Sequence, residues 1–266
     1  MNIIPQLLRE IKDSQALTQR ELAIKLNISL GSTNKYIHEL EEKHYLTVIG
    51  NSYQLTKEGH AFLETFHVDN AVIIAAGFGS RFVPLTYETP KGLLEVFGER
   101  MIERQIKQLH DVGIFDITIM VGYLKEKFDY LIDKYDVTLI YNPEYATKNT
   151  LATLWHARHL LKNTYILSSD NWIRENIFHT YEPCAWYSGV YMKGATSEWC
   201  LSTDKKGRIT DVVIGGSDSY VMYGPVYFDH DFSKRFIPFL EKYYNSPGTE
   251  NLYWENVYMD NLKMLP

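Results

Sequence analysis

The stretch AVIIAAGFGSRFVPLTYETPKGLLEVFG, residues 71 to 98, decides the fold that we predict for this chain. Its first five residues, Ala71 to Ala75, are apolar, too few to span a membrane, and typical of a strand buried on both faces. A glycine turn follows at once. Gly77 and Gly79 have no Cβ atom, so the backbone can take positive φ there and bring N–H groups close to an anion. The stretch therefore predicts a strand that ends in a phosphate cradle.

Two cations flank this cradle. Arg81 lies two residues beyond the second glycine, and Lys91 follows a proline in Thr-Pro-Lys. No Gly-Lys-Ser/Thr follows the turn, which excludes a Walker loop. Phe82 and Val83 stand where a dinucleotide fingerprint needs its third glycine. The predicted phosphate cradle is thus neither a Walker loop nor a dinucleotide-binding turn.

The complete pattern reads strand, Ala-Ala-Gly-x-Gly-Ser-Arg, Pro-Leu-Thr and Thr-Pro-Lys-Gly-Leu-Leu within 24 residues. It resembles the signature of the nucleotidyltransferases that join a nucleoside triphosphate to a phosphorylated small molecule. The resemblance implies that the turn and a second glycine motif bind the nucleotide. These residues are Ala75, Ala76, Gly77, Phe78, Gly79, Ser80, Gly122 and Tyr123.

Composition bounds the class of protein. The chain has 266 residues, 45% of them hydrophobic, which is enough for two globular domains. Its formal charge of −6 argues against a protein that coats nucleic acid or anionic membrane. The cysteines, Cys184 and Cys200, form no CxxC pair and favour a reducing compartment. There is no signal peptide and no apolar run of 18 residues, so we expect a cytoplasmic protein without membrane insertion.

Residues 1–67 are predicted to form a separate small domain. Thr18 and Glu21 form a capping-box pair at the start of the second of four helices. The pattern of helices and hairpin resembles a winged helix-turn-helix domain. Its predicted helices cover residues 2–13, 18–26, 32–43 and 57–66, and its predicted hairpin strands cover residues 45–49 and 53–56.

The third helix of such a domain enters the major groove, and its expected exposed side chains are Ser32, Thr33, Asn34, Lys35 and His38. Residues 18–56 are therefore a candidate DNA-binding region. Residues 1–67 hold seven Lys/Arg against eight Asp/Glu, whereas phosphate neutralisation needs a basic face. A docking or dimerisation module is the alternative.

Residues 68–266 are predicted to form the nucleotidyltransferase domain. Strands and helices alternate from residue 71, which predicts an α/β fold with a Rossmann-like, mostly parallel sheet and ligands at the carboxyl ends of its strands. The predicted strands cover residues 71–75, 117–121, 138–141 and 165–167, and the predicted helices cover residues 102–112, 125–135 and 149–161.

A metal site is expected at Asp170, which follows the strand at 165–167 about 90 residues after the glycine turn. Triphosphate chemistry needs a hard cation such as Mg²⁺, held by one or two carboxylates, water and phosphate oxygens. The second carboxylate should come from a distant segment, and Leu-Tyr-Trp-Glu-Asn at residues 252–256 is the best candidate.

Four further motifs narrow the resemblance to the bacterial CTP:phosphocholine cytidylyltransferases over nearly all of residues 71–266. They are Val-Gly-Tyr-Leu-Lys at 121–125, Asn-Pro-Glu-Tyr-Ala at 142–146, Ser-Glu-Trp at 197–199 and Tyr-Trp-Glu-Asn at 253–256. In that family an aspartate follows the last tryptophan and binds metal, which places the role on Glu255, one methylene longer. Asp260 is the fallback ligand.

Aromatic residues make up 14% of the chain. A trimethylammonium group donates no hydrogen bonds, so selective binding relies on aromatic faces and a nearby carboxylate. The candidates for such a cage are Tyr191, Trp199, Tyr253 and Trp254, with core packing as the alternative for each. Relatives place polar groups near the base or acceptor at Asn149 and Thr153, although a helix N-cap explains Asn149 equally well.

The resemblance implies attack by the phosphate of phosphocholine on the α-phosphorus of CTP, which gives CDP-choline and pyrophosphate. A phosphomonoester has a second pKa of about 6, so no general base is required. Arg81 and Lys91 would hold the phosphates, and Mg²⁺ on Asp170 and Glu255 would bridge to the α-phosphate.

Three alternatives stay open. In the first two, the acceptor is 2-aminoethylphosphonate or a sugar 1-phosphate instead of phosphocholine. A sugar would need more hydroxyl-binding groups, and a primary ammonium would need more direct acidic partners. The third alternative is a transcription regulator that senses a nucleotide or a choline metabolite, which would not need Arg81, Lys91, Asp170 and Glu255 together. Relatives continue beyond the position of Pro266 with a strand and a helix, so we expect a longer protein.

Overall fold

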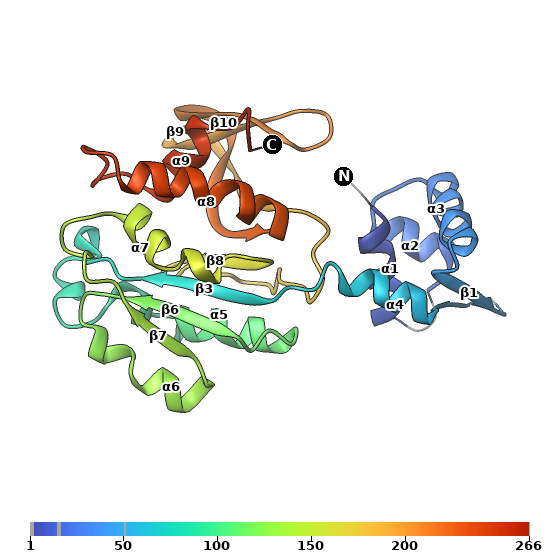
Figure 1. Cartoon of the computed structure of the whole chain (residues 1–266), viewed down its shortest axis with the longest axis horizontal. Coiled ribbons are helices and arrows are strands. Elements are labelled where there is room, and N and C mark those ends of the chain that lie inside the picture. The colour runs from blue at the N-terminus through green and yellow to red at the C-terminus, as the bar shows by residue number, and fades with distance from the viewer. Residues whose placement is uncertain (1–2, 15–16, 51, 266) are drawn as a thin grey trace. The chain divides into compact units, whose positions relative to one another are not determined.

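The computed structural model describes residues 3–14, 17–50 and 52–265. The chain divides into two compact units (Figure 1). The N-terminal unit comprises residues 1–68 together with 180–184, and the C-terminal unit comprises residues 69–179 and 185–266.

The N-terminal unit has the predicted order of helices and hairpin. Thr18 and Glu21 form the predicted capping box. The third helix begins two residues earlier than expected, because the Ser29 side chain accepts from the Ser32 amide and caps it. Residue 2 and Asn51 lie outside the described residues. The elements are α1 (Ile4–Asp13), α2 (Gln19–Lys25), α3 (Leu30–Glu42), β1 (Leu46–Ile49), β2 (Ser52–Leu55) and α4 (Lys57–Glu64).

A short segment from far along the chain completes this unit. Thr180 O accepts from the Val68 amide at 2.9 Å, and the Glu182 amide donates to Phe66 O at 2.9 Å. Between them, Tyr181 is 4% exposed and belongs to the same apolar core as Leu7, Leu22 and Leu63.

The phenol of Tyr181 and its backbone are both hydrogen-bonded within the N-terminal unit. Its hydroxyl accepts from Lys12 Nζ at 2.8 Å and donates to Glu64 Oε1 at 2.7 Å. Its carbonyl accepts from Arg9 Nη1 at 3.0 Å. Residues 180–184 are therefore a structural part of the N-terminal unit, although they lie more than 100 positions beyond residue 68 in the sequence.

The C-terminal unit is built on a six-stranded sheet in the order β7-β6-β3-β8-β10-β9. The first four strands in this order are parallel, and β10 runs antiparallel to β8 and to β9. The predicted α/β fold with a mostly parallel sheet is confirmed. The strands are β3 (Asn70–Ala75), β6 (Ile117–Val121), β7 (Thr138–Tyr141), β8 (Thr164–Ser168), β9 (Trp186–Thr203) and β10 (Ile209–Phe228), with a small hairpin of β4 (Glu95–Val96) and β5 (Glu99–Arg100).

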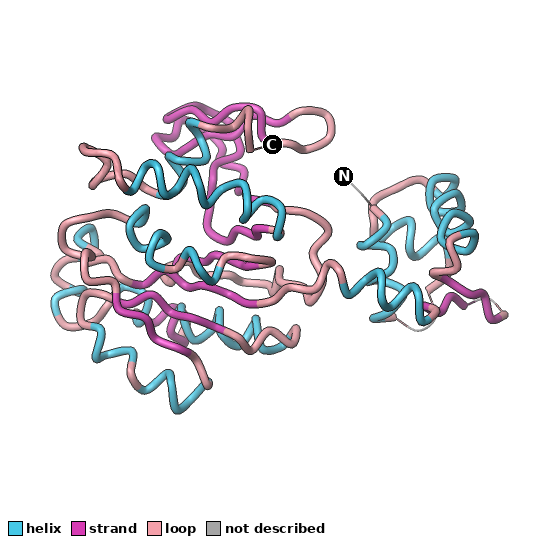
Figure 2. The backbone as a smooth tube through the Cα atoms, in the orientation of Figure 1, coloured by secondary structure: helices cyan, strands magenta, loops and turns pink. Residues whose placement is uncertain are grey.

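Helices cover both faces of this sheet (Figures 1 and 2). On one face α7, α8 and α9 pack on β3, β8 and β10 through a core that includes Ile74, Phe236 and Trp254. Figure 1 shows α5 and α6 against the other face. All six residues of β3 are buried, as the unbroken apolar run predicts. The helices are α5 (Met101–Asp111), α6 (Tyr130–Tyr135), α7 (Thr150–His156), α8 (His230–Tyr244) and α9 (Trp254–Asp260), and 3₁₀ turns cover Ser80–Phe82, Leu85–Tyr87, Lys91–Leu93, Lys125–Phe128 and Arg158–Leu160.

Two predicted helices are shorter than expected. The segment 125–135 is a 3₁₀ turn followed by α6, and α7 stops at His156 before a second 3₁₀ turn. After residue 167, where no element was predicted, the structure has the long β9–β10 hairpin, α8 and α9. No helix within the described ranges is long and apolar enough to cross a bilayer.

Candidate active site

The predicted glycine turn leaves the carboxyl end of β3. Of its two glycines, Gly79 adopts positive φ (63°) and Gly77 does not, so the expectation of such freedom is correct for Gly79 alone. A Cβ atom on Gly79 would approach Thr86 Cγ2 to 3.0 Å and Lys91 Cβ to 3.2 Å. Thr86 Oγ1 also donates to Gly79 O at 3.0 Å. The turn is therefore folded directly against Lys91, while Gly77 and Ser80 stay exposed.

Lys91 forms an ion pair with Asp170 across the carboxyl edge of the sheet, with Nζ donating to Oδ2. The pair depends on a close approach of two backbones, because a Cβ on Gly92 would meet Ser169 Cβ and Oγ at 2.6 Å. Lys91 Nζ also lies 4.4 Å from the centroid of the Phe82 ring. The structure thus brings together the glycine turn, the cation and the carboxylate that the sequence places up to 93 positions apart.

Arg81 extends from the 3₁₀ turn Ser80–Phe82 and is exposed. Among the described residues it makes no hydrogen bond or ion pair, so its guanidinium is available to an anion arriving at the turn.

The second glycine motif lies beside the first. A Cβ atom on Gly122 would meet Ala76 O and Tyr145 Cβ at 2.6 Å, so only glycine fits there. The Tyr123 amide donates to Ala76 O at 3.1 Å. The ring of Phe78 lies 4.9 Å from that of Tyr123. The predicted nucleotide-binding residues from Ala75 to Ser80 and at 122–123 therefore form one continuous edge at the ends of β3 and β6.

Asn149 and Thr153 have structural partners in α7. Asn149 caps the helix, since its Oδ1 accepts from the Thr150 amide at 2.8 Å. Thr153 is 3% exposed, and its hydroxyl accepts from Asn142 Nδ2 at 2.9 Å. Their predicted contact with the nucleotide stays a prediction.

Glu255 lies in the first turn of α9, with its carboxyl group buried although other atoms of the residue are partly exposed. Its Oε1 accepts from the Tyr187 hydroxyl at 3.3 Å, and its Oε2 has no hydrogen-bond partner among the described residues. Burial raises the pKa of Glu255 to about 7. Asp260, the fallback ligand, accepts from the Tyr243 hydroxyl at 2.9 Å on an exposed face.

The predicted cage residues divide into separate groups. The rings of Trp199 and Tyr253 meet edge to face with centroids 5.6 Å apart. Tyr191 is 53% exposed and contacts Tyr220 instead. Trp254 is 4% exposed and lies in the core, where its ring stacks on Tyr187 at 6.0 Å. Trp199 and Tyr253 are thus the two predicted cage residues whose rings contact each other, Trp199 half-buried and Tyr253 exposed.

Asp170 and Glu255 each carry an oxygen of the kind that binds a divalent cation. Within residues 3–14, 17–50 and 52–265, no three His, Cys, Asp or Glu side chains converge as a metal site. Asp170 offers a carboxylate, and the buried, unpartnered Oε2 of Glu255 is an oxygen that a cation would satisfy. One or two carboxylates with phosphate oxygens and water is the usual Mg²⁺ arrangement in nucleotide sites.

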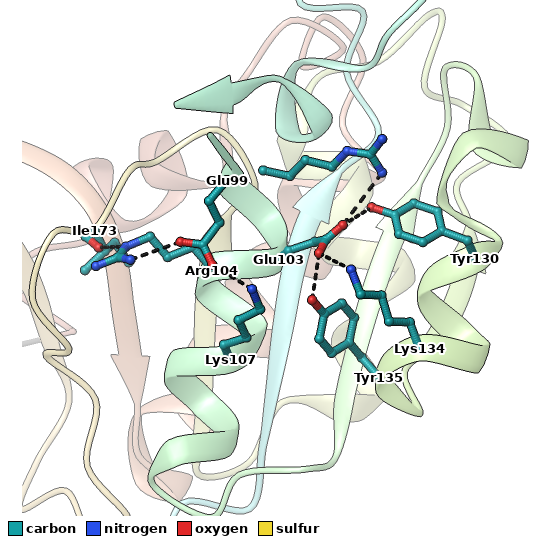
Figure 3. Close-up of polar contacts among 9 residues, drawn as sticks. Glu99, Glu103, Arg104, Lys107, Tyr130, Lys134, Tyr135 and Ile173 are labelled. Carbon is teal, nitrogen blue, oxygen red and sulfur yellow. Dashed lines mark hydrogen bonds and ion pairs between the residues drawn. The ribbon is translucent and has the colours of Figure 1, made fainter. Parts of the chain in front are cut away.

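A separate polar network surrounds the start of α5 (Figure 3). Burial alone would raise the pKa of Glu103, but hydrogen bonds from Lys134, Tyr130 and Tyr135 outweigh it and lower the pKa to about 2. A cavity of about 450 Å³ lies here, apart from the glycine turn, and the acidic and basic side chains on its wall largely pair with one another. We assign it no ligand.

On α3 of the N-terminal unit, Asn34, Lys35 and His38 are exposed as expected. Thr33 is fully buried, and its hydroxyl donates to Ser29 O, so its expected exposure is wrong. Ser32 is half-buried and bonds the Ser29 hydroxyl. Helical periodicity explains the error, since Thr33, Ile37 and Leu40 share the inward face.

The chain matches two family models, Winged helix-turn-helix over residues 1–71 and Nucleotidyl transferase over residues 70–185. It is 37% identical to the choline-phosphate cytidylyltransferase of Streptococcus pneumoniae over 195 residues, 73% of this chain and 85% of that protein. It is 38% identical to the 2-aminoethylphosphonate cytidylyltransferase of Lancefieldella rimae over 200 residues, 74% of this chain and 81% of that protein. A solved structure of CTP:phosphocholine cytidylyltransferase from Streptococcus pneumoniae matches with a TM-score of 0.72 at 37% identity, covering 74% of this chain and 86% of that one.

Proposed function

This chain belongs to the nucleotidyl transferase family, and from that membership we propose that it transfers the cytidylyl group of CTP to phosphocholine, giving CDP-choline and pyrophosphate. The observation that carries the proposal is the Lys91–Asp170 ion pair packed against the Gly79 turn. A cation, a carboxylate and exposed backbone meet there at the carboxyl edge of a parallel sheet, where α/β proteins bind nucleotides.

The reaction forms a bond between a phosphate oxygen of phosphocholine and the α-phosphorus of CTP. It breaks the bond from that phosphorus to the β-phosphate, which leaves as pyrophosphate. Because the attacking phosphate is already anionic near neutral pH, the protein has to align two anions and neutralise their charge. Lys91 exchanges Asp170 for phosphate oxygens when the triphosphate arrives, and Arg81 supplies the second positive charge.

We propose Mg²⁺ as the cation and Asp170 with Glu255 as its protein ligands. Bound there, the metal would supply positive charge to the α-phosphate. Glu255 would hold the metal as a deprotonated carboxylate, the form that metal binding requires.

Phosphocholine is favoured as acceptor by the edge-to-face contact of the partly exposed Trp199 and Tyr253 rings. Aromatic rings attract a quaternary ammonium that cannot be hydrogen-bonded. The second candidate is 2-aminoethylphosphonate, because a relative named for it is 38% identical. Its primary ammonium would need acceptor oxygens, so Trp199→Ala should raise the KM for phosphocholine more than the KM for 2-aminoethylphosphonate.

The test is pyrophosphate release in the presence of Mg²⁺. CTP and the other nucleoside triphosphates would each be paired with phosphocholine, 2-aminoethylphosphonate and glucose 1-phosphate, with Asp170→Asn as the inactive control. Release confined to CTP with phosphocholine supports the whole proposal. Release with another acceptor keeps cytidylyl transfer and refutes the choline assignment, and release with no pair refutes the proposed reaction in favour of a sensor.

The N-terminal unit suggests DNA binding as a second activity. Asn34, Lys35 and His38 are exposed along α3, the helix that enters the major groove in this class. Four of the seven Lys/Arg of residues 1–67 already have protein partners: Arg9, Lys12, Lys25 and Lys43. Fluorescence anisotropy with duplex DNA tests the activity, and Lys35→Ala should reduce both affinity and its salt dependence.

We also propose a cytoplasmic location, which the thiols of Cys184 and Cys200, neither of them in a disulfide, support. Fractionation of the source cells would test it.

A further inference from the structure

The backbone around Asp170 is held from one side by side chains of α5. Gln105 Nε2 donates to Ser168 O and to Asn171 O, both at 2.8 Å. Arg104 Nε donates to Ile173 O at 2.6 Å, and Gln108 Nε2 donates to the same oxygen at 3.0 Å. Three side chains from one helix thus bind the carbonyls of a single short segment.

Gln105 differs from the other two because its acceptors lie on either side of Asp170. The segment Ser168–Asn171, which we call the Asp170 turn, is closed by the Asn171 amide donating to Ser168 O at 3.2 Å. Gln105 is fully buried, and its Nε2 donates to the carbonyls at both ends of this turn. Its Oε1 has no hydrogen-bond partner among the described residues. Its contacts are therefore directed entirely at the Asp170 turn.

The opposite side of the turn is also fixed. The Ser169 amide donates to Ile74 O of β3 at 3.0 Å, and Gly92 packs against Ser169 without room for a Cβ. Gln105 holds the turn from the α5 side through Ser168 O and Asn171 O. With it in place, the carboxylate of Asp170 is presented to Lys91.

We infer that Gln105 is a positioning residue, which sets the Asp170 carboxylate for the cation and the transferring phosphate. This inference rests on the proposed function of the same site. It assigns a role to a helix side chain that lies outside every motif of the sequence analysis.

The rest of the α5 contact remains when Gln105 is changed, so the variant should fold. Figure 3 shows Arg104 between Ile173 and Glu99. Its Nη1 donates to Glu99 Oε2 at 3.0 Å, and its guanidinium lies 4.7 Å from the centroid of the Trp172 ring. The hydrogen bond from Arg104 to Ile173 O and the contact of Arg104 with the Trp172 ring do not involve Gln105. Loss of Gln105 should therefore disturb the Asp170 turn alone.

The test compares Gln105→Met with Gln108→Met. Both changes remove amide donors from α5 at similar side-chain volume, but the acceptor of Gln108 is Ile173 O, beyond the Asp170 turn. We expect Gln105→Met to lower kcat by about tenfold to a hundredfold, as losing the support of a ligating group usually does, and to raise the Mg²⁺ concentration for half-maximal activity. Gln108→Met should change thermal stability by a comparable amount and leave the Mg²⁺ requirement unchanged.

A double variant separates positioning from simple loss of structure. If Gln105 acts through Asp170, adding Gln105→Met to Asp170→Asn should lower kcat by no more than about twofold further, because residues that act as a unit are not additive. Full multiplication of the two losses would overturn the inference.

Binding of Mn²⁺ alone, followed by electron paramagnetic resonance, distinguishes this inference from the proposed reaction. Gln105→Met and Asp170→Asn should both weaken binding, and Gln108→Met should not, even if the wild-type protein proves inactive with every substrate pair. Mn²⁺ binding that is unchanged by Gln105→Met or by Asp170→Asn would overturn the role of Gln105.

Discussion

Replacing Gly92 by alanine should separate Lys91 from Asp170. The added Cβ would meet Ser169 Cβ and Oγ at 2.6 Å and Ser169 O at 3.1 Å, whereas ordinary contact begins at 3.4 Å. Gly92 does not have positive φ, so backbone strain plays no part. The whole effect comes from the crossing of the Lys91 and Asp170 segments.

The size of the effect follows from the missing space. The two segments must part by about 0.8 Å, the difference between 2.6 Å and 3.4 Å, and the atom in the way is a Cβ that no side-chain rotation removes. Overpacking of this kind costs about 1–3 kcal/mol of folding free energy. A displacement of about 1 Å between reacting groups costs about 100-fold in rate. Activity should therefore fall far more than stability.

The assay is kcat for pyrophosphate release at saturating CTP and acceptor, with thermal unfolding measured beside it. Ser169→Gly removes both atoms at 2.6 Å, so the double variant Gly92→Ala/Ser169→Gly should recover at least about tenfold of the lost rate. Ser169→Gly alone is the control. A Gly92→Ala protein with wild-type kcat, or a double variant without recovery, would refute the steric reasoning.

Three further predictions concern single side chains. Lys91→Ala should lower kcat by about 100-fold or more, because its charge stabilises the transferring phosphate. The melting temperature should fall by only a few degrees, because the Lys91–Asp170 ion pair is partly exposed and contributes little to folding. Normal kinetics would contradict the role of Lys91. Glu103→Gln should destabilise the protein at pH 7 by up to about 3 kcal/mol, since the pKa of Glu103 is lowered from 4.5 to about 2. The difference in unfolding free energy between wild type and variant should be complete above pH 4.5 and shrink as the pH falls toward 2. Urea unfolding at pH 7, 5 and 3.5 would measure it. Tyr181→Phe removes the hydroxyl that joins Lys12 to Glu64 and should cost about 1–3 kcal/mol, visible as faster amide exchange in residues 3–68 but not in the β3–β6 region.

The centre of the sheet was predictable because β3 and β6 are buried along their whole length. Ile117–Val121 and Thr138–Tyr141 have the bounds expected from their apolar runs. The glycine turn, Lys91 and Asp170 were predicted together because they match the signature of the nucleotidyltransferases that the sequence resembles. The Thr18–Glu21 capping box was equally readable, since its partners are three residues apart.

What could not be predicted depends on contacts between distant residues. The strands β9 and β10 are mostly exposed or half-buried and include glycines and charges, so they lack the apolar run that marks β3. α8 contains Pro238, which normally argues against a helix interior. Gln105 sits mid-helix with no local signal, and its role appears only when α5 meets the Asp170 turn. Trp254 shares a motif with Glu255, yet the fold directs its ring into the core.

The insertion of residues 180–184 into the N-terminal unit bears on how such a chain can arise and be dissected. A gene fusion at one junction would bring in residues 1–68 but not Tyr181, whose ring and hydroxyl complete that unit. The residues that form this unit thus come from two separate places in the coding sequence. For the same reason, a fragment cut at residue 68 is an incomplete protein, and exchange of this unit between relatives requires the pentapeptide at 180–184 to travel with it.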